Sequence, residues 1–595
     1  MRRTTRLALL LVLLANTVPA WAAAIIDGVR IEGIDDELMI ENVNGALSLN
    51  DVIGRRMGES RLEYLLSEAE AQTREALEPF GYYTPDIRVD AQRSGEGENE
   101  RIFIVIHVQR GEPVRVRRSS IGIEGEGGSD RYLKEDLAEF TPRIGDVFDH
   151  TTYEASKLKI VRRLADRGYF DADFTRRRVE VTRAEHAADI DLAWVSGIRY
   201  DMGPTIFHQD KFDPGLLDKL VYWEEGSYFH QGKLDRLRES LVGLDYFANI
   251  DIQANPDNAV DGRVPIDVNL SLAKRTLYTA GISYGTESGP GIRLGMDRRY
   301  VNSKGHKASV QLDFATRRKI LLAQYRIPAF KWLDGWYTIA TQFSDEQTDY
   351  IDLRHVELIG SRSGQISEDW TAVASIHALR ERWAYYEDAD GNDIEGPPKY
   401  AYATFTYPSL KADYVNAPVG SNRPDRLSGS VLMRGGIEGA GSDANFFQLH
   451  MRALWSREFG RNSALIFRGE YGHTFTGNPI DMPPSLRFFA GGDGSIRGYA
   501  WREVGPRNGK YALGAKNVLT ASAEYDFYPK GGAWGGAVFV DTGSAFDSDL
   551  PNLRTGVGIG LRWRSPVGPV RLDIGHGLND PDSQFQIYLN IGNSL

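Results

Sequence analysis

Two different hydrophobic patterns divide the chain near residue 275. Before this point, segments that alternate apolar and polar residues lie among segments whose apolar residues recur three and four positions apart. Alternation is typical of strands, and the longer period is typical of amphipathic helices. After this point the helical period disappears, and segments of about ten residues alternate apolar with small or polar residues. The pattern predicts an α+β part followed by an all-β part.

A weak repeat with a spacing of about 75 to 90 residues runs through the α+β part. Its marker is the end of an amphipathic helix followed by an aromatic pair and an alternating strand, found at 77–83, 164–170 and 241–247. Another alternating strand closes each copy, at 102–108, 190–195 and 266–272. Each unit reads β-α-α-β-β, in which two helices bury their apolar stripes on one face of a small sheet. We expect three such domains, at 23–112, 113–197 and 198–274.

The all-β part, 275–595, has the alternation of a membrane β-barrel. Tyr278, Ala280, Ile282 and Tyr284 face one way, and the residues between them face the other. We count sixteen such segments, the first at 275–285 and the last at 583–592. An even number of strands places both ends of the barrel on the same side of the membrane. A large soluble all-β domain is the alternative.

The first residues have the form of a targeting segment. Arg2, Arg3 and Arg6 precede an unbroken apolar run at 7–15, and Ala-Trp-Ala at 20–22 is a small-x-small cleavage site. We expect residues 1–22 to be a signal peptide; an uncleaved anchor is the alternative. After residue 23 no long uncharged apolar run follows, so a membrane role would have to use a β-barrel.

Composition excludes several classes of function. The chain has 62 glycines and no cysteine, which excludes disulfide scaffolds, thiol catalysis and cysteine-ligated metals. Its net charge of −12 argues against a general nucleic-acid binder, because phosphate contacts need a basic surface. We therefore expect no nucleic-acid partner.

The glycine-rich stretch at 489–499 contains the core Ile496-Arg497-Gly498-Tyr499. About forty residues later, Phe-Val-Asp-Thr-Gly at 539–543 places Asp541 and Gly543 in an otherwise apolar, strand-like segment. An arginine and an aspartate among glycines and aromatic residues predict a loop tied by a buried ion pair rather than an enzyme site.

Other motifs fail the test of context. Gly281-Ile-Ser283-Tyr-Gly285 matches the G-x-S-x-G nucleophile pattern, but it lies in an alternating strand instead of a strand–turn–helix. The acidic stretch at 388–395 has its glycine at the fourth position, whereas a calcium loop needs it at the sixth. The sequence contains no phosphate-binding loop motif and no histidine spacing typical of a metal site. We expect no enzyme activity, no cofactor and no metal site.

Together these features resemble the BamA/TamA surface-antigen family of outer-membrane assembly and translocation proteins. Members carry periplasmic POTRA repeats, each β-α-α-β-β, followed by a sixteen-stranded antiparallel transmembrane β-barrel. The Arg-Gly-Tyr stretch resembles the family's motif in the sixth extracellular loop, which folds into the lumen; here that loop is 476–513. The resemblance implies that Arg497 pairs with Asp541. This pair is either a purely structural tie or a device that keeps the lumen closed and the barrel primed.

The family also places a lateral gate between the first and last barrel strands. Carried over, the gate would lie between about 277–285 and 585–592. Glycine offers no side-chain packing in a strand, so glycines here would weaken the seam. The candidate gate residues are Gly281, Gly285, Phe585, Ile587, Leu589 and Gly592.

The resemblance implies an outer-membrane protein with its repeats in the periplasm. Its function would be the insertion or secretion of client β-proteins, such as autotransporters, through the gate. Three repeats and about 600 residues resemble the translocation-and-assembly-module branch, which implies a large inner-membrane-anchored partner spanning the periplasm. Unfolded outer-membrane clients and outer-membrane lipids are the other expected partners. A two-partner secretion pore and a lipid-transport conduit remain as alternatives.

Overall fold

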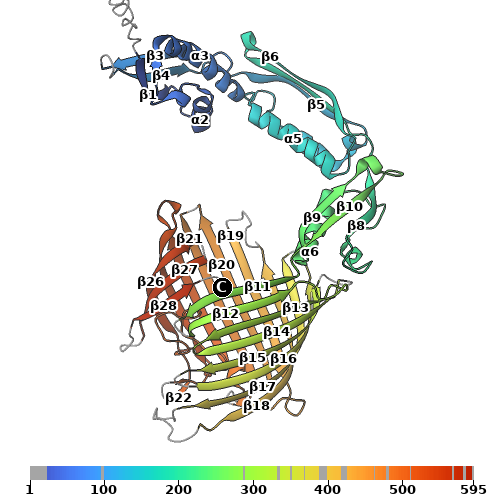
Figure 1. Cartoon of the computed structure of the whole chain (residues 1–595), viewed down its shortest axis with the longest axis vertical. Coiled ribbons are helices and arrows are strands. Elements are labelled where there is room, and N and C mark those ends of the chain that lie inside the picture. The colour runs from blue at the N-terminus through green and yellow to red at the C-terminus, as the bar shows by residue number, and fades with distance from the viewer. Residues whose placement is uncertain are drawn as a thin grey trace, which may run out of the picture. The chain divides into compact units, whose positions relative to one another are not determined.

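A computed structural model gives the fold of the chain (Figure 1). It describes residues 23–95, 100–285, 288–330, 335–348, 351–367, 369–386, 398–416, 425–460, 462–477, 481–508, 511–565, 568–579 and 585–591. The predicted signal peptide 1–22, the acidic stretch 388–395 and Gly592 lie outside these ranges. Within them, no helix is both long and apolar enough to cross a bilayer.

The first repeat packs two helices on a four-stranded sheet with the order β2-β1-β4-β3. Leu62 and Leu65 of the long helix pack into one core with Ile104 and Ile106 of the central strand. Residues three apart lie on one face of a helix, and residues two apart lie on one face of a strand, so these apolar side chains face each other. Its elements are β1 (Ala23–Glu32), α2 (Glu37–Ala46), β2 (Arg56–Gly58), α3 (Glu59–Leu77), β3 (Asp86–Ser94) and β4 (Arg101–Gln109).

The second repeat has a three-stranded sheet with the order β5-β7-β6, and its helices begin at aspartate caps. Asp130 and Asp149 accept hydrogen bonds from the backbone amides of Tyr132 and Thr152, which satisfies free N–H groups of the first turns. Its elements are β5 (Arg115–Glu124), α4 (Arg131–Ala138), α5 (His150–Asp166), β6 (Asp173–Thr182) and β7 (Ala187–Val195).

The third repeat keeps the sheet, with the order β8-β10-β9, but its first helix is only a four-residue 3₁₀ turn. The marker position that is Gly168 in the second repeat, with φ +86°, is Asp245 here, with φ +57°. Aspartate is among the few residues that tolerate this left-handed backbone. The repeat's elements are β8 (Asp201–His208), η6 (Leu217–Leu220), α6 (Gln231–Gly243), β9 (Phe247–Ala254) and β10 (Arg263–Leu272).

The rest of the chain forms a sixteen-stranded sheet in which every strand pairs antiparallel with its neighbour in sequence order, which confirms the predicted barrel. The strands are β11 (Thr276–Gly285), β12 (Gly289–Arg298), β13 (Lys307–Ala315), β14 (Arg318–Pro328), β15 (Gly335–Gln347), β16 (Ile351–Gln365), β17 (Trp370–Tyr385), β18 (Ala401–Val415), β19 (Asp425–Gly436), β20 (Phe446–Phe459), β21 (Ser463–Thr476), β24 (Asn517–Phe527), β25 (Trp534–Phe546), β26 (Arg554–Ser565), β27 (Gly568–Gly577) and β28 (Gln586–Ile591).

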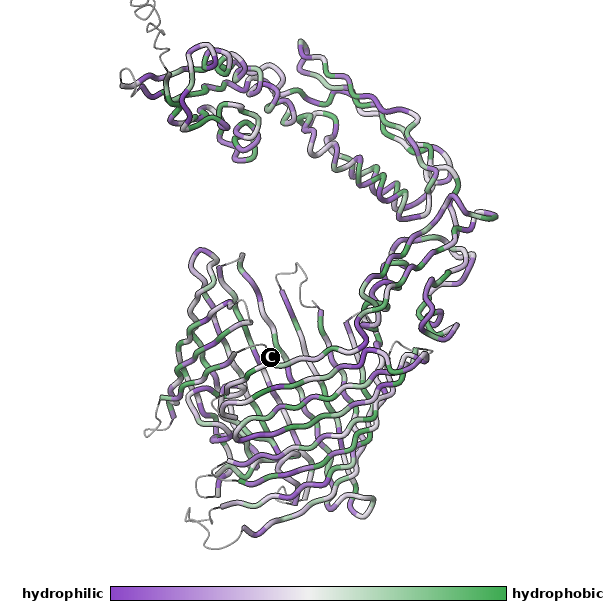
Figure 2. The backbone as a smooth tube through the Cα atoms, in the orientation of Figure 1, coloured by the Kyte–Doolittle hydropathy of each residue, from purple (hydrophilic) through white to green (hydrophobic). Residues whose placement is uncertain are grey.

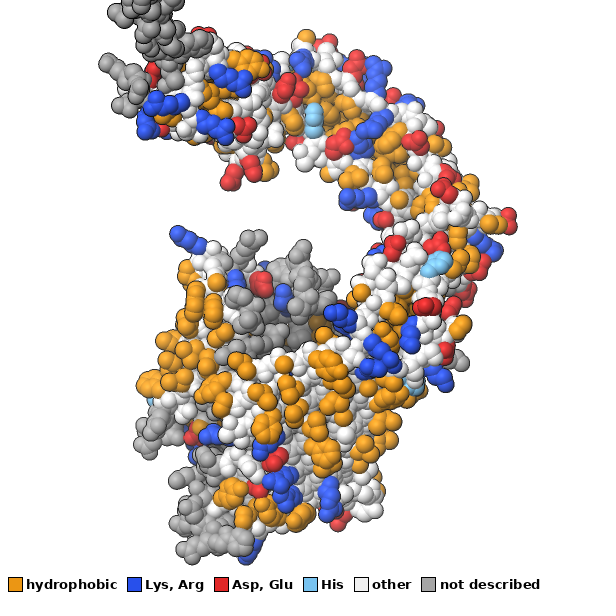
Figure 3. Space-filling view, viewed as in Figure 1, with side chains coloured by type: hydrophobic (Ala, Val, Ile, Leu, Met, Phe, Trp, Pro, Cys, Tyr) orange, Lys and Arg blue, Asp and Glu red, His pale blue; other side chains and the backbone are white. Residues whose placement is uncertain are grey.

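Side chains alternate between the outer face and the lumen along these strands. Tyr278 and Ile282 are 74% and 90% exposed on the outside, whereas Tyr588 of the last strand points inward and is 5% exposed. Hydropathy alternates along the barrel strands in Figure 2, and hydrophobic side chains cover much of the outer barrel face in view in Figure 3. An apolar exterior with a polar interior is what a lipid-embedded barrel requires.

The two edges of the barrel sheet are β11 and β28, which lie next to each other. Among the described residues, six of β28, Gln586–Ile591, pair with Val570–Gly575 of β27.

Candidate functional site

The candidate site lies where the loop between β21 and β24 meets the lumenal wall of the last barrel strands. The loop carries a short hairpin, β22 (Arg507–Asn508) and β23 (Tyr511–Ala512). Ile496 and Tyr499 are buried in a small core with Val504 of the loop and Ala545 of β25. The glycine-rich stretch is therefore packed inside the barrel, as the family resemblance implies.

Arg497 makes the predicted ion pair with Asp541. Its Nε and Nη2 atoms donate to the two carboxylate oxygens of Asp541 at 2.7 and 3.0 Å, a bidentate arrangement. The backbone amide of Arg497 donates to the same carboxylate at 3.0 Å. Arg497 is 2% exposed and Asp541 is fully buried, so solvent screens the pair little.

Two further carboxylates hold the same guanidinium. Nη1 of Arg497 donates to Glu524 of β24 at 2.6 Å and to Asp573 of β27 at 3.1 Å. The guanidinium carbon lies 3.5 Å from the ring centre of Phe539, which covers it as a cation–π partner. Acids from three strands therefore converge on one arginine of the loop.

A second buried arginine, Arg562 of β26, completes the network. It donates to Glu524 at 2.8 Å and to Asp526 at 3.2 Å, and it also pairs with Asp573. Glu524 and Asp573 thus each bridge the two guanidiniums. Fixing each carboxylate between two cations offsets the cost of burying it.

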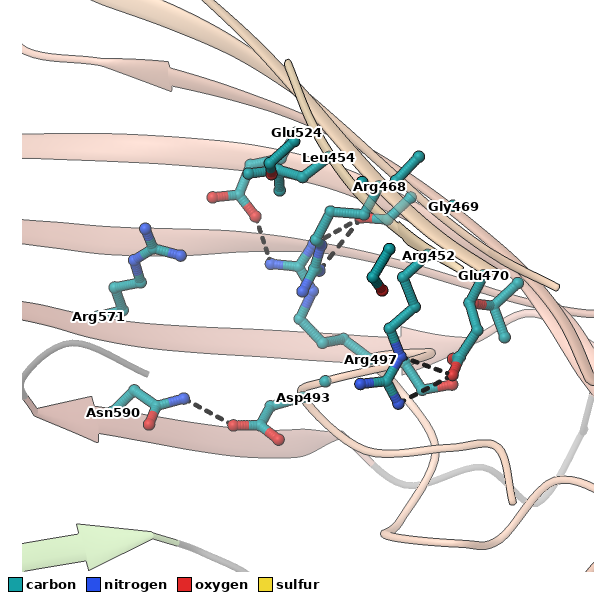
Figure 4. A pocket seen from close by; sticks show the side chains of 18 of the residues that line it. Arg452, Leu454, Arg468, Gly469, Glu470, Asp493, Arg497, Glu524, Arg571 and Asn590 are labelled. Carbon is teal, nitrogen blue, oxygen red and sulfur yellow. Dashed lines mark hydrogen bonds and ion pairs between the residues drawn. The ribbon is translucent and has the colours of Figure 1, made fainter. Parts of the chain in front are cut away.

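Figure 4 shows the cavity beside this network, which encloses about 590 Å³. Arg468 lies on this cavity and donates to Ser522 at 3.2 Å, and Arg571 points toward it from β27. Glu470, Asp493 and Arg452 line the same cavity. The mutual pairing of Arg497 and Arg562 with the four carboxylates fits a structural role.

Glycines in the wall let the loop backbone lie directly against it. A Cβ on Gly556 of β26 would stand 1.8 Å from the carbonyl oxygen of Arg497, and one on Gly575 of β27 would stand 2.7 Å from the amide nitrogen of Gly498. Gly498 has φ +100°, a conformation that suits glycine. Gly543, by contrast, serves the contact between β24 and β25, since its Cβ would stand 2.4 Å from the carbonyl oxygen of Leu519.

The loop also holds the inner face of the last strand. The Tyr588 hydroxyl accepts from the Gly498 amide at 3.0 Å and donates to the Tyr499 carbonyl at 2.6 Å. Asn590 Nδ2 donates to Asp493 at 2.6 Å, as Figure 4 shows. The motif therefore reaches past its ion pair and contacts β28, an edge strand of the barrel sheet.

The predicted gate residues that the structure describes lie at the two edges of the barrel sheet. Gly281 and Gly285 lie in β11, where they pair with Arg293 and Gly289 of β12. Phe585 and Ile587 face outward, 72% and 56% exposed, and Leu589 pairs with Leu572 of β27. The five described gate residues lie in the edge strands or directly before β28, Gly592 is outside the described residues, and a gating movement stays a prediction.

Sequence reasoning missed Glu524, Asp526, Arg562 and Asp573, and it missed Tyr588 and Asn590. Their signal was present, because each is a polar residue at a lumen-facing position of an alternating strand. Gly281-Ile-Ser283-Tyr-Gly285 lies within strand β11, the context that argued against a nucleophile. Within the ranges that the structure describes, no three or more His, Asp or Glu side chains are arranged so that they could hold a metal ion.

Substituting Tyr588 with phenylalanine should loosen the contact between the loop and β28. The change removes both hydrogen bonds at once and leaves two buried backbone groups without this partner, at a cost of about 1–3 kcal/mol. We expect faster amide exchange in β28 and at Gly498. Tyr525→Phe is the matched control, because Tyr525 is 42% exposed on the outer face of β24. Equal amide-exchange rates in the two variants would show that the Tyr588 hydroxyl does not hold the loop against β28.

Comparisons with known proteins give the following matches. Residues 424–595 match the model of the Omp85 superfamily domain, residues 28–110 match "POTRA domain TamA domain 1", and residues 116–193 match the POTRA model described as a surface antigen variable number repeat.

Two curated relatives are named outer membrane protein assembly factor BamA. The one from Nitratidesulfovibrio vulgaris is 24% identical over 81% of this chain, and the one from Neisseria meningitidis is 22% identical over 85%. The alignments span 62% and 70% of those relatives' own lengths. The crystal structure of BamA from Haemophilus ducreyi lacking POTRA domains 1–3 covers 80% of this chain and 99% of its own, with a TM-score of 0.64 and 17% identity. That likeness supports the fold.

Proposed function

We propose that this chain, an Omp85-superfamily β-barrel of the outer membrane with POTRA domains in the periplasm, assembles client β-proteins at the seam between β11 and β28. The observation that carries the proposal is the contact of the Arg497 loop with the inner face of β28. A loop that grips one edge strand from inside can set how readily that edge opens. The curated relatives' name, outer membrane protein assembly factor, supports the same reading.

The proposed mechanism is strand addition at the edges of the barrel sheet, β11 and β28, which stand at the two ends of the strand order. An open edge presents backbone N–H and C=O groups that pair with an incoming strand. Clients would add their strands here and leave sideways into the membrane. The buried network around Arg497 would hold the lumen closed and keep the barrel wall in shape while this happens.

The finer proposal is membership of the translocation-and-assembly-module branch, as a TamA-like protein. The match of 28–110 to the first POTRA domain of TamA and the three repeats support it. Its clients would be autotransporter-like, and its partner would be a TamB-like, inner-membrane-anchored periplasmic protein. The edge strands of the POTRA sheets, such as β3 and β6, are the surfaces on which an extended partner segment would add by β-augmentation.

A two-partner secretion pore is the second candidate, and the loop argues against it. Arg497 and Tyr499 are buried in the lumen, so a passive pore would first have to displace a loop held by buried ion pairs. A lipid-transport conduit uses the same scaffold and is distinguished by the cargo. The proposal includes no enzymatic reaction and no cofactor.

Locking the seam tests the proposal. Because the chain has no native cysteine, a panel of paired cysteines, one in β11 and one in β28, forms only the intended crosslinks. We expect oxidation to abolish assembly of a reporter barrel in proteoliposomes and reduction to restore it. The same vesicles report phospholipid transfer, which separates protein insertion from a lipid conduit.

A cysteine pair at Ser361 and Ser375 is the control, since these residues face each other in the ladder between β16 and β17. That crosslink should leave assembly unchanged. Full assembly of the reporter barrel with the seam crosslinked would overturn the proposal that clients enter between β11 and β28. Affinity capture through a tag placed after Ala23 then tests the partner, which we expect to be a large, inner-membrane-anchored, β-rich protein.

A further inference from the structure

The loop that carries Arg497 also docks on strands far from the Arg497 network. Met482 and Leu486, which precede the glycine-rich stretch, are buried in one core with residues of β16, β17, β18 and β20. The backbone amide of Ser485 donates to Glu381 of β17 at 3.2 Å. The first part of the loop is therefore held by a different section of the wall from the one that holds Arg497.

Arg502, which follows the Arg497 motif, ties the loop to β15. Its Nη1 atom donates to Oε1 of Glu346 at 3.0 Å, and Glu346 lies next to the last residue of β15. The Glu346 side chain is 8% exposed and the Arg502 side chain is 25% exposed. A carboxylate this deeply buried needs a cationic partner, because burying an unpaired charge is costly.

Two aromatic rings fix the position of the Arg502 guanidinium. Its central carbon lies 4.3 Å from the ring centre of Phe489 and 4.1 Å from that of Trp501, within the range of cation–π contacts. Arg502 also has φ +58°, a left-handed backbone that residues other than glycine rarely adopt. Such a conformation persists only where the surrounding contacts fix it, and it often occurs at functional positions.

The two ion pairs of the loop lie in opposite sections of the barrel wall. Glu346 belongs to β15, the fifth of the sixteen strands, and Asp541 belongs to β25, the thirteenth. Because β11 and β28 lie next to each other, eight steps separate β15 from β25 in either direction around the sheet. Arg497 and Arg502 are five positions apart in the chain, so a short segment of the loop spans the lumen between the two pairs.

We propose that segment 497–502 is a strut across the lumen and that Arg502 is the positioning residue that fixes its far end. At the near end the strut contacts β28, because the Tyr588 hydroxyl is hydrogen-bonded to backbone groups of Gly498 and Tyr499. The Arg497 network holds only this end of the segment. With Arg502 held on Glu346 as well, the backbone at Gly498 and Tyr499 keeps a fixed position against β28.

The exchange of backbone amides in β28 tests the strut without reference to any client. The full-length protein is purified in detergent, and hydrogen–deuterium exchange is followed by mass spectrometry. Arg502→Met keeps an apolar stem between the two rings but removes the charge, and we expect exchange in β28 to become about tenfold faster. Glu346→Gln should have a similar effect, and the double variant should add little, because the two residues act as a pair. Arg502→Lys, which keeps the charge, should stay near the wild-type rate.

Arg507→Met is the matched control, since Arg507 lies in the same loop but pairs with Glu503 of the loop itself. This variant should leave exchange in β28 unchanged, and heat-modifiable electrophoretic mobility shows that each variant is folded. Wild-type exchange of β28 in Arg502→Met would overturn the strut. An equal rise in β12 and β13, which hold neither ion pair, would mean a general loss of stability and would also overturn it.

The effect on client assembly rests on the proposed function and is measured separately, with the reporter barrel in proteoliposomes. We expect Arg502→Met and Glu346→Gln to lower its assembly and Arg507→Met to leave it unchanged. Faster exchange in β28 with normal assembly would support the strut and overturn the proposal that the loop sets how the seam opens. Wild-type exchange in β28, whatever the assembly, would overturn the strut alone.

Discussion

Replacing Arg497 with alanine should undock the loop and abolish client assembly. In the wild type, Arg497 and Arg562 together face four buried carboxylates. Without Arg497, Asp541 loses its ion-pair partner while remaining fully buried. Removing one partner of a buried ion pair costs about 3–5 kcal/mol, because the charge that remains is uncompensated. The barrel should therefore unfold at lower temperature and lose its assembly activity together.

Asp541→Ala should be milder than Arg497→Ala. Arg497 would still contact Glu524 and Asp573, so the guanidinium keeps two of its three carboxylates. The double variant should be less impaired than the sum of the two single variants, because the two residues interact directly. Thermal unfolding in detergent and reporter assembly in cells give the two measurements.

Arg452→Ala provides the control for charge removal alone. Arg452 pairs with Glu470 at 3.0 Å but is 65% exposed, and exposed ion pairs contribute about 0–1 kcal/mol. If Arg497→Ala behaved like this control, the buried network would have no role in stability or function. Wild-type activity in Asp541→Ala would likewise remove Asp541 from the functional motif.

Gly556→Val should have a comparable effect without changing any charge. The Cβ of valine would stand 1.8 Å from the carbonyl oxygen of Arg497, far closer than two non-bonded atoms can approach. The contact joins the backbone of the loop to the backbone of β26, so no side-chain rotation can relieve it. The loop must therefore move away from the wall. Moving it separates Arg497 from its carboxylates, so we expect loss of assembly and cleavage of the loop by added protease.

Gly469→Ala is the matched control for this prediction. Gly469 lies in β21, and a Cβ there would meet nothing within 4 Å. This variant should keep a protected loop and normal assembly. A protected loop in Gly556→Val would show that the wall does not need a glycine at this position.

The barrel was predictable because its signal is local and repeated. Alternation places Tyr278 and Ile282 on the outer face of the barrel and the residues between them on the lumenal face. The pairing of Arg497 with Asp541 was predictable from two short motifs. The limits of the loop were less accurate, since the predicted loop ends at 513 and β24 begins at Asn517.

The rest of the site depends on geometry that no local pattern contains. Glu524 and Asp573 lie on β24 and β27, and only the register of four paired strands brings both to one guanidinium. Tyr588 reaches Gly498 across 90 residues of chain because the loop crosses the lumen. The sequence also did not predict that the first helix of the third repeat would be only a four-residue 3₁₀ turn. Tertiary packing decides whether a weak helical segment forms full α-helical turns.

The origin of the arginine's ligands has a consequence for how the protein itself is made. Asp541, Glu524 and Asp573 belong to three strands, and Tyr588 belongs to the last. The receptor for the loop therefore does not exist until the C-terminal strands have paired in register. Docking of the loop is necessarily a late event in biogenesis, and a protease-sensitive loop marks a barrel whose final strands are not yet in place.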